Sequence, residues 1–225
     1  MATAIDAPAV HAPAVDVTAV DISAVDQRGA RRPKSRWRVI DIVVASVIAA
    51  AVGLVYFSWN LIYSPASAPL QAALPGLQSL VYGVWLVGGV LGGFIIRKPG
   101  AAVYVSLVAA SVSALLGSQW GLLTLESGLV QGLGAELIFL MFAYSNWRPI
   151  VAMLAGGASG LALGINDLGL WFPGATPVFA VIYTSSAIIS GAVIAGLGSW
   201  FLLRGLVATG ALNRFASGRQ ARVEA

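Results

Sequence analysis

The chain has 225 residues, of which 58% are hydrophobic and only 10% are charged, and its mean hydropathy is +0.86. Soluble domains carry about 25% charged residues, so one soluble core could not bury this much apolar surface. The formal net charge of +4 does not indicate nucleic-acid binding, because the basic residues lie beside apolar segments, where they set membrane orientation. The composition therefore predicts an integral membrane protein.

The side chains that most catalytic sites need are absent from the apolar part of the chain. The sequence has no cysteine, and its one histidine, His11, lies near the N-terminus. Thiolate chemistry and imidazole-based metal sites, triads or proton relays are thereby excluded. A phosphate-binding loop needs glycine before its lysine, whereas Lys34 follows a proline and Lys98 an arginine. We predict a non-catalytic protein without a metal site or cofactor.

The first 35 residues contain a short Ala-Val-Asp repeat at residues 14–16, 19–21 and 24–26. A basic run from Arg28 to Arg38 follows it. Spaced acids, with no long apolar run before the charges, are unlike a signal peptide. We predict a disordered cytoplasmic tail over residues 1–35.

Six apolar segments follow, each of a length suited to crossing a hydrocarbon core of about 30 Å. We predict spanning helices at 37–57, 79–96, 101–117, 128–146, 149–166 and 178–203. The connections at 58–78, 118–127 and 167–177 contain proline or glycine, which favour turns. The predicted fold is all-α, a polytopic bundle of six transmembrane helices over residues 36–205 with a basic tail at 206–225.

The basic residues predict the orientation of this bundle. All 13 lysine and arginine residues lie near the two termini or in the connections after the second and fourth spans. Positively charged connections are retained in the cytoplasm. Both termini of this multi-pass plasma-membrane protein are therefore predicted to be cytoplasmic, with the three proline- or glycine-containing connections outside.

Small residues spaced four apart allow two helices to approach closely in lipid. The first span has such a row at Ala45, Ala49 and Gly53, and the second, fourth and fifth spans have glycine rows. Packing within the bundle explains most of these rows. The row in the first span is instead a candidate surface for a partner subunit.

A carboxylate inside a membrane is costly and normally faces a cavity, a partner or a ligand. Glu136 lies about 12 Å along the fourth span if that span begins near Gly128. Gly128 and Gly132 share its helix face and leave space beside it. Two interpretations remain open: Glu136 contacts a ligand or an ion, or it is a protonated side chain hydrogen-bonded between helices.

Aromatic residues gather in the outward half of the predicted bundle, and an interfacial belt explains most of them. They are Tyr56, Trp59, Tyr63, Tyr82, Trp85, Trp120, Trp171 and Phe172. Gln119 and Trp120 in the outer connection lie near Glu126, and Asn166 and Asp167 end the fifth span. This combination of ring face, amides and carboxylates suits a flat, nitrogen-rich or cationic molecule. Solvated helix ends explain Glu126 and Asp167 equally well.

Three sequence motifs point to a known family. They are Ile-Arg-Lys-Pro-Gly-Ala-Ala at 96–102, Leu-Leu-Gly-Ser-Gln-Trp-Gly at 115–121 and Gln-Gly-Leu-Gly-Ala-Glu at 131–136. Together they resemble the YkoE family, the substrate-binding S components of energy-coupling-factor (ECF) transporters linked to thiamine and its hydroxymethylpyrimidine precursor. The resemblance covers about residues 36–205, in order and with six spans.

The resemblance implies a subunit that captures the vitamin from outside and delivers it through a transmembrane coupling protein and two ATPase subunits. It also implies that the row of Ala45, Ala49 and Gly53 docks on the coupling protein. The predicted substrate-binding residues are Glu136, Trp120, Gln119, Glu126, Asp167 and Asn166.

Two alternatives remain, a self-sufficient secondary transporter with Glu136 as proton carrier and a structural membrane protein without a ligand. Against the first, the two halves of the chain show no matching pair of interrupted helices.

Overall fold

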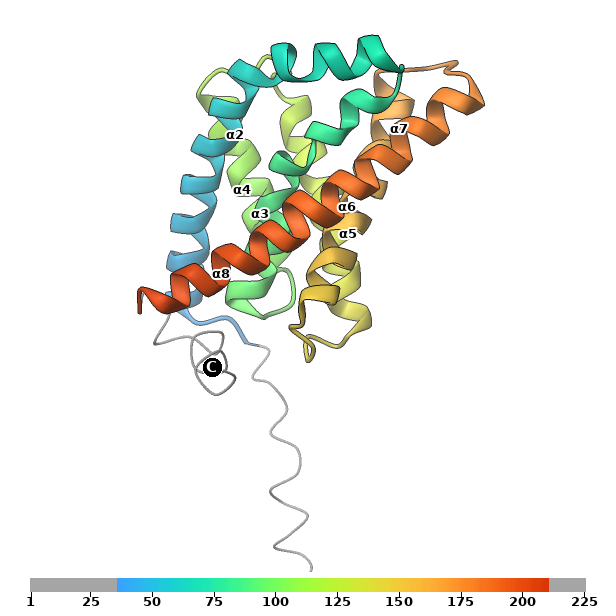
Figure 1. Ribbon diagram of the computed structural model, residues 1–225. Helices are drawn as coiled ribbons and strands as arrows, with labels where there is room; N and C mark the ends of the chain where they lie inside the picture. The colour runs from blue at the N-terminus through green and yellow to red at the C-terminus, as the bar shows by residue number, and fades with distance from the viewer. Residues whose placement is uncertain (1–35, 211–225) are drawn as a thin grey trace, which may run out of the picture. The chain divides into compact units, whose positions relative to one another are not determined.

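The computed structural model describes residues 36–210, and every regular element in that range is helical. The predicted N-terminal tail at 1–35 lies outside the described residues. So does most of the predicted basic tail at 206–225, namely residues 211–225. The bundle consists of α2 (Val39–Ala73), α3 (Gly83–Ile96), α4 (Ala101–Leu115), α5 (Leu123–Met141), α6 (Pro149–Leu170) and a last long helix (Figure 1). In that last helix α7 (Pro177–Ser190), the π-helical segment η2 (Gly191–Leu197) and α8 (Gly198–Ala208) follow one another directly. The predicted all-α fold of six helices is confirmed.

The six helices differ in length. Four are long and apolar enough to span a membrane, namely α2, α5, α6 and the continuous helix Pro177–Ala208. The other two, α3 and α4, have 14 and 15 residues. At 1.5 Å per residue, α3 is about 21 Å long, against a hydrocarbon core of about 30 Å. The two short helices therefore depend on neighbouring helices to shield them from the lipid that they cannot cross by themselves.

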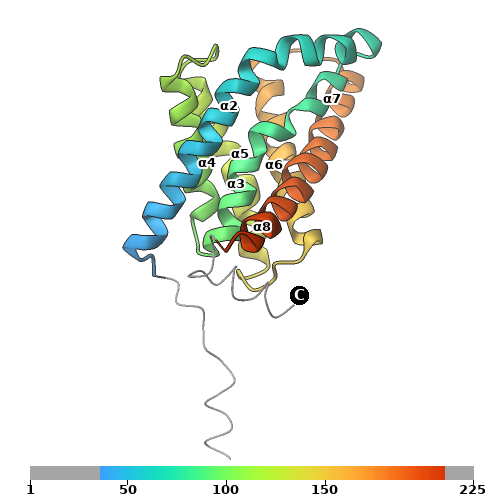
Figure 2. The same ribbon diagram turned by 60° about the vertical axis from the view of Figure 1, so that its left-hand side comes forward.

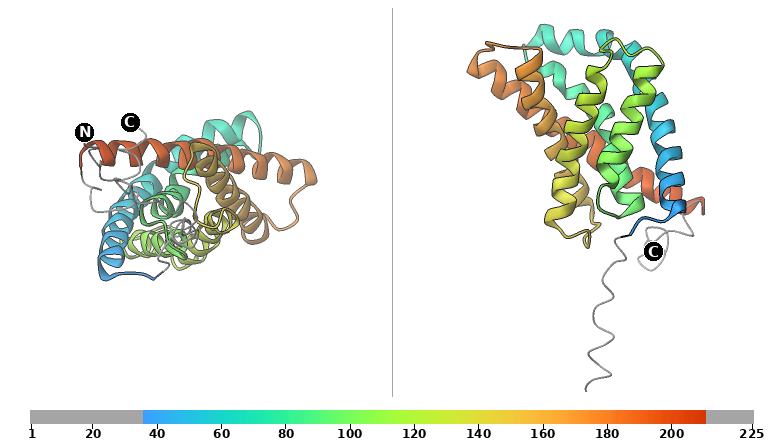
Figure 3. Two further views of the ribbon diagram at one scale, coloured as in Figure 1. Left: turned by 90° about the horizontal axis from the view of Figure 1, so that it is seen from below. Right: turned by 180° about the vertical axis from the view of Figure 1, so that it is seen from behind.

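Helix α3 lies in the middle of the bundle. It contacts α2, α4, α5, α6, η2 and α8. The views from opposite sides in Figures 1 and 3 show the last helix crossing one face of α3, with α4 and α5 on the other. Glycines on α3 make this possible, because a Cβ at Gly92 would lie 2.6 Å from Val105 and one at Gly83 2.5 Å from the Ser190 carbonyl oxygen. Neighbouring helices thus approach the α3 backbone where a side chain on α3 could not fit.

The first helix is longer than predicted. The expected loop at 58–78 is mostly helical, because α2 continues through Pro65 and Pro69 to Ala73. A proline inside a helix removes one backbone hydrogen bond and bends the helix without ending it when neighbours support the bend. Figures 1 and 2 show the outer part of α2 bending over one end of the bundle. The 3₁₀ turn η1 (Leu77–Val81) then leads back into α3.

The small-residue row on α2 faces inward, which corrects its predicted position. Ala45 and Ala49 are 0% exposed, and a Cβ at Gly53 would lie 2.8 Å from the Ala109 carbonyl oxygen of α4. Residues four apart share one helix face, so all three residues pack toward α4. The row lets α2 and α4 approach closely, and it leaves no surface there for a coupling protein in this arrangement.

Polar contacts fix the α3–α4 turn to the start of α2. Asp41 is 1% exposed and pairs with Lys98 in the turn and with Arg38 at 3.1 Å. The Trp37 indole nitrogen donates to the Pro99 carbonyl oxygen at 2.9 Å. Figures 1 and 2 place this turn, the start of α2 and the end of α8 at the same end of the bundle. The ion pair compensates the buried charge of Asp41 and the partly buried charge of Lys98 at this end of the bundle.

We predict that Gly156→Ala destabilises the bundle. A Cβ at Gly156 would overlap the Gly191 carbonyl oxygen and lie 2.8 Å from the Gly196 nitrogen, so α6 and η2 would have to separate. Overpacking of this kind costs about 1–3 kcal/mol. Thermal unfolding of the detergent-purified protein should show a lower Tm. Gly169→Ala in the same helix is the matched control, because its Cβ would meet nothing within 4 Å. Equal melting of the two variants would contradict the packing argument.

Candidate functional site

A cavity of about 270 Å³ lies at the end of the bundle away from the α3–α4 turn. Its lining comes from the outer part of α2, the start of α3, the end of α4, the start of α5 and the end of α6. This volume is close to the lower end of the range for small-molecule sites, about 300–1,000 Å³. The cavity therefore suits one small molecule.

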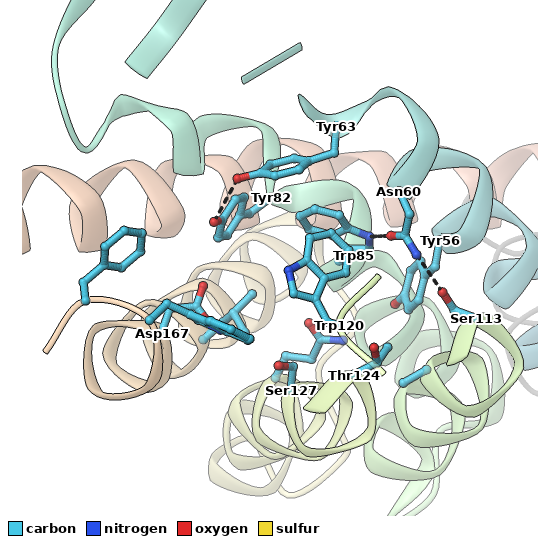
Figure 4. Close-up of a pocket in the computed structure, with 15 residues that line it drawn as sticks. Tyr56, Asn60, Tyr63, Tyr82, Trp85, Ser113, Trp120, Thr124, Ser127 and Asp167 are labelled. Atoms are coloured by element: carbon cyan, nitrogen blue, oxygen red, sulfur yellow. Dashed lines mark hydrogen bonds between the residues drawn. The ribbon is translucent and has the colours of Figure 1, made fainter. Parts of the chain in front are cut away.

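Four aromatic rings form one wall of the cavity (Figure 4). The Trp85 ring centre lies 4.9 Å from Tyr63, 5.4 Å from Tyr82 and 5.1 Å from Trp120. The rings are tilted or edge-on to each other, with interplanar angles of 52–87°. Such a cluster offers π faces for stacking on a flat ring or for attracting a cation.

Asn60 holds part of this wall in place. Its amide oxygen accepts from the Trp85 indole nitrogen at 2.9 Å, and its amide nitrogen donates to Ser113 at 3.1 Å. Both bonds are drawn in Figure 4. The Trp120 indole nitrogen, in contrast, has no hydrogen-bond partner within residues 36–210. It is thus a donor that a ligand could use.

Asp167 is the one charged side chain among the lining residues. It is 5% exposed, and its Oδ2 accepts a hydrogen bond from the Tyr183 hydroxyl at 2.8 Å. A buried carboxylate without a cationic neighbour calls for a hydrogen-bond donor or a positive charge. The cavity therefore combines aromatic faces with one acidic group.

Comparisons with known proteins agree on what kind of protein carries this cavity. Residues 40–162 match a family described as the permease component of an ABC-type cobalt transport system. A solved S component of an ECF transporter superposes with a TM-score of 0.76 at 34% identity, covering 84% of this chain and 95% of that one. The Bacillus subtilis (strain 168) protein described as putative HMP/thiamine permease protein YkoE is 36% identical over 82% of this chain and 92% of its own length. The chain belongs to the YkoE family of ECF S components. The family resemblance predicted from the sequence is confirmed.

Membership in this family also confirms the predicted class of protein. S components are non-catalytic subunits of transporters, and the apolar helices of this one make it a multi-pass membrane protein. A site in an S component acts by holding its substrate. The features of the cavity that matter for its function are therefore its shape, its aromatic faces and its hydrogen-bonding groups. Catalytic side chains are not needed.

Only some of the six predicted substrate-binding residues of this S component line the cavity. Trp120 and Asp167 line the cavity. Asn166 donates to Glu126 at 3.0 Å, which joins α5 and α6 beside the cavity, but neither residue lines it. Gln119 is exposed and also outside the lining. Two of the six residues are therefore in contact with the cavity.

Glu136 lies in a different part of the S component from the one predicted. Its carboxylate accepts from the backbone nitrogens of Gly100 at 2.6 Å and Ala102 at 2.9 Å, and from the Tyr144 hydroxyl. The first backbone N–H groups of a helix lack intrahelical partners and attract a negative charge, so Glu136 caps α4. Because α5 begins at Leu123, Glu136 lies about 20 Å along it, far from the helix start that borders the cavity.

Several lining residues were not distinguished by sequence reasoning. An interfacial belt explains Tyr63, Tyr82 and Trp85 at the level of sequence, and neither Asn60 nor Gln131 is predicted there as a substrate-binding residue. Gln131 is 4% exposed and donates to Ser106 across the α4–α5 contact at 3.2 Å. An amide inside an apolar span is a signal that could have identified Gln131, because it requires partners within the bundle. Asn60 falls in the connection predicted at 58–78, where an amide is ordinary.

We predict that Glu136→Gln lowers stability and leaves ligand affinity unchanged. The neutral amide weakens the bonds to the α4 N-terminus, at a cost of about 1–3 kcal/mol. Thermal unfolding and calorimetric titration of the same detergent-solubilised preparation would measure both effects. A folded Glu136→Gln variant with weakened thiamine binding and an unchanged Tm would instead return Glu136 to the substrate site.

Proposed function

We propose that this S component captures thiamine or its hydroxymethylpyrimidine precursor in the cavity beside Asp167. The observation that carries the proposal is a single buried carboxylate in a cavity that also has a wall of aromatic rings. The relative from Bacillus subtilis, described as an HMP/thiamine permease, supports this substrate class. We expect the protein to bind this substrate without changing it chemically.

The chemistry of the substrate matches the groups in the cavity. An aminopyrimidine has an exocyclic amine that donates to a carboxylate, and its flat ring can lie against an indole. Thiamine adds a positively charged thiazolium ring, which aromatic faces attract. Asp167 supplies the acceptor, and Trp120 supplies both a ring face and a free N–H donor.

The matched family description names cobalt, but the cavity favours an organic ring. Divalent transition metals prefer several imidazole, thiolate or carboxylate ligands together. The lining contains one carboxylate and no other side chain of these types. Within residues 36–210 no three such side chains lie close enough to hold a metal ion.

Energy for uptake would come from other subunits, since the sequence has no phosphate-binding loop. We propose that the chain works in the plasma membrane with a transmembrane coupling protein and two ATPase subunits, the arrangement implied by S-component membership. A secondary transporter driven through Glu136 is less well supported. Its carboxylate is occupied by the α4 N-terminus and lies outside the cavity.

We predict that Trp120→Ala and Asp167→Asn each weaken thiamine binding. Loss of one partner in a buried contact costs about 1–3 kcal/mol, which corresponds to about 5- to 150-fold in Kd. Calorimetric titration with thiamine and with hydroxymethylpyrimidine would measure both variants. Glu136→Gln is the matched control for Asp167→Asn, because it neutralises an acid outside the cavity. Folded variants that bind both compounds like the wild type would place the substrate elsewhere.

The orientation of the bundle is also part of the proposal. Cytoplasmic termini would place the cavity toward the outside, because the start of α2 and the cavity lie at opposite ends of the bundle. Every basic residue within residues 36–210 lies toward the end where α2 begins and α8 ends, as the positive-inside rule requires for a cytoplasmic face.

We predict that single cysteines introduced into this cysteine-free chain report this orientation. An impermeant maleimide added to intact cells should label Leu122→Cys, which is 83% exposed in the α4–α5 connection. Ser145→Cys in the α5–α6 connection is exposed too, and should react only after permeabilisation. The reverse labelling pattern would contradict an outward-facing cavity.

A further inference from the structure

Tyr183 lies directly behind the cavity wall. It is 0% exposed on α7 and is not among the lining residues. Its hydroxyl is 2.8 Å from Asp167 Oδ2 and 2.8 Å from the Tyr82 hydroxyl. One side chain that no ligand would touch thus contacts two that line the cavity.

The hydrogen bonds around Tyr183 have a preferred direction. A hydroxyl has one proton, so Tyr183 donates to one of its two partners at a time. An ionised Asp167 can only accept, so the Tyr183 hydroxyl donates its hydrogen bond to Asp167, and Tyr82 is then the donor in the contact between the two tyrosines. The Tyr82 hydroxyl is also 3.2 Å from that of Tyr63 on α2, the bond drawn in Figure 4. A chain of three hydroxyls therefore ends on one oxygen of Asp167.

The Tyr183 hydroxyl cannot easily move away. The Phe179 ring stacks on the Tyr183 ring at 5.5 Å, and Phe172 packs edge-on at 5.2 Å. The Tyr183 carbonyl oxygen accepts from Ser79 in η1 at 2.7 Å. Both the ring and the backbone are thus held by neighbours, which fixes the hydroxyl relative to Asp167.

We propose that Tyr183 is a positioning residue that occupies Asp167 Oδ2 and so presents Oδ1 to the amine or cation of the substrate. This role rests on the proposed function of the cavity. Without the hydroxyl, the carboxylate could rotate about its side-chain bonds and share its charge between two orientations. Charge-assisted hydrogen bonds are strong only in good geometry, so substrate affinity would fall although Tyr183 makes no substrate contact.

A double-mutant cycle tests this role. Tyr183→Phe removes the hydroxyl and keeps the packed ring, and it should weaken thiamine binding about 5- to 30-fold in calorimetric titration. In an Asp167→Asn background the same change should alter Kd less than about twofold, because the interacting carboxylate is absent. Tyr104→Phe is the matched control, since its hydroxyl contacts Ser46 at 2.7 Å, away from the cavity. An equal loss in both backgrounds would show a general packing effect and overturn the proposal.

A measurement without ligand separates this inference from the proposed function. The infrared carboxylate band of Asp167 can be assigned as the band lost in Asp167→Asn. Tyr183→Phe should shift it, because a hydrogen bond to the carboxylate is removed, and Tyr104→Phe should not. If the wild type binds neither thiamine nor hydroxymethylpyrimidine, the proposed function fails and the band alone decides the role of Tyr183. An unshifted band overturns that role.

Discussion

Close packing of neighbouring helices against the glycines of α3 is the constraint on which the rest of the structure depends. Gly83, Gly88, Gly92 and Gly93 face the last helix, α2, α4 and α5 respectively, and a Cβ at any of them would overlap a neighbour. Because these neighbours surround α3, a helix of 14 residues can remain inside the bundle although it is too short to cross a bilayer alone. Its first turn borders the cavity. There Tyr82 and Trp85 face the space that becomes the cavity.

The cavity is accordingly formed where helices of unequal length end. The bent outer part of α2 extends past the start of α3 and contributes Asn60 and Tyr63 to the cavity. The aromatic wall and the acid come from separate elements, and Tyr183 connects them by contacting both Tyr82 and Asp167. Substrate recognition in this S component thus depends on packing between helices as much as on the groups that meet the ligand.

The sequence predicted the number of helices well, because a hydropathy window detects each segment that is apolar for long enough to cross a bilayer. It predicted their ends poorly. Prolines at 65 and 69 were interpreted as part of a loop, whereas tertiary support keeps α2 helical to Ala73. The predicted position of Glu136 was wrong for the same reason, since depth along a helix depends on where that helix begins.

Likewise, four-residue spacing at Ala45 and Ala49 indicates a close helix contact but does not identify the contacting helix, which is α4. Trp120 and Asp167 line the cavity because they border connections whose position follows from the order of the spans.

The shortness of α3 and α4 has a consequence for biosynthesis. A helix of 14 or 15 residues is too short to cross the bilayer by itself, because its ends would remain among lipid tails with unpaired backbone groups. Joined by the turn at 97–100, the two segments can enter the bilayer as one hairpin beside α2. Asp41, already at the start of α2, then meets Lys98 as the hairpin arrives. The ion pair at this end of the bundle thereby joins the hairpin to α2.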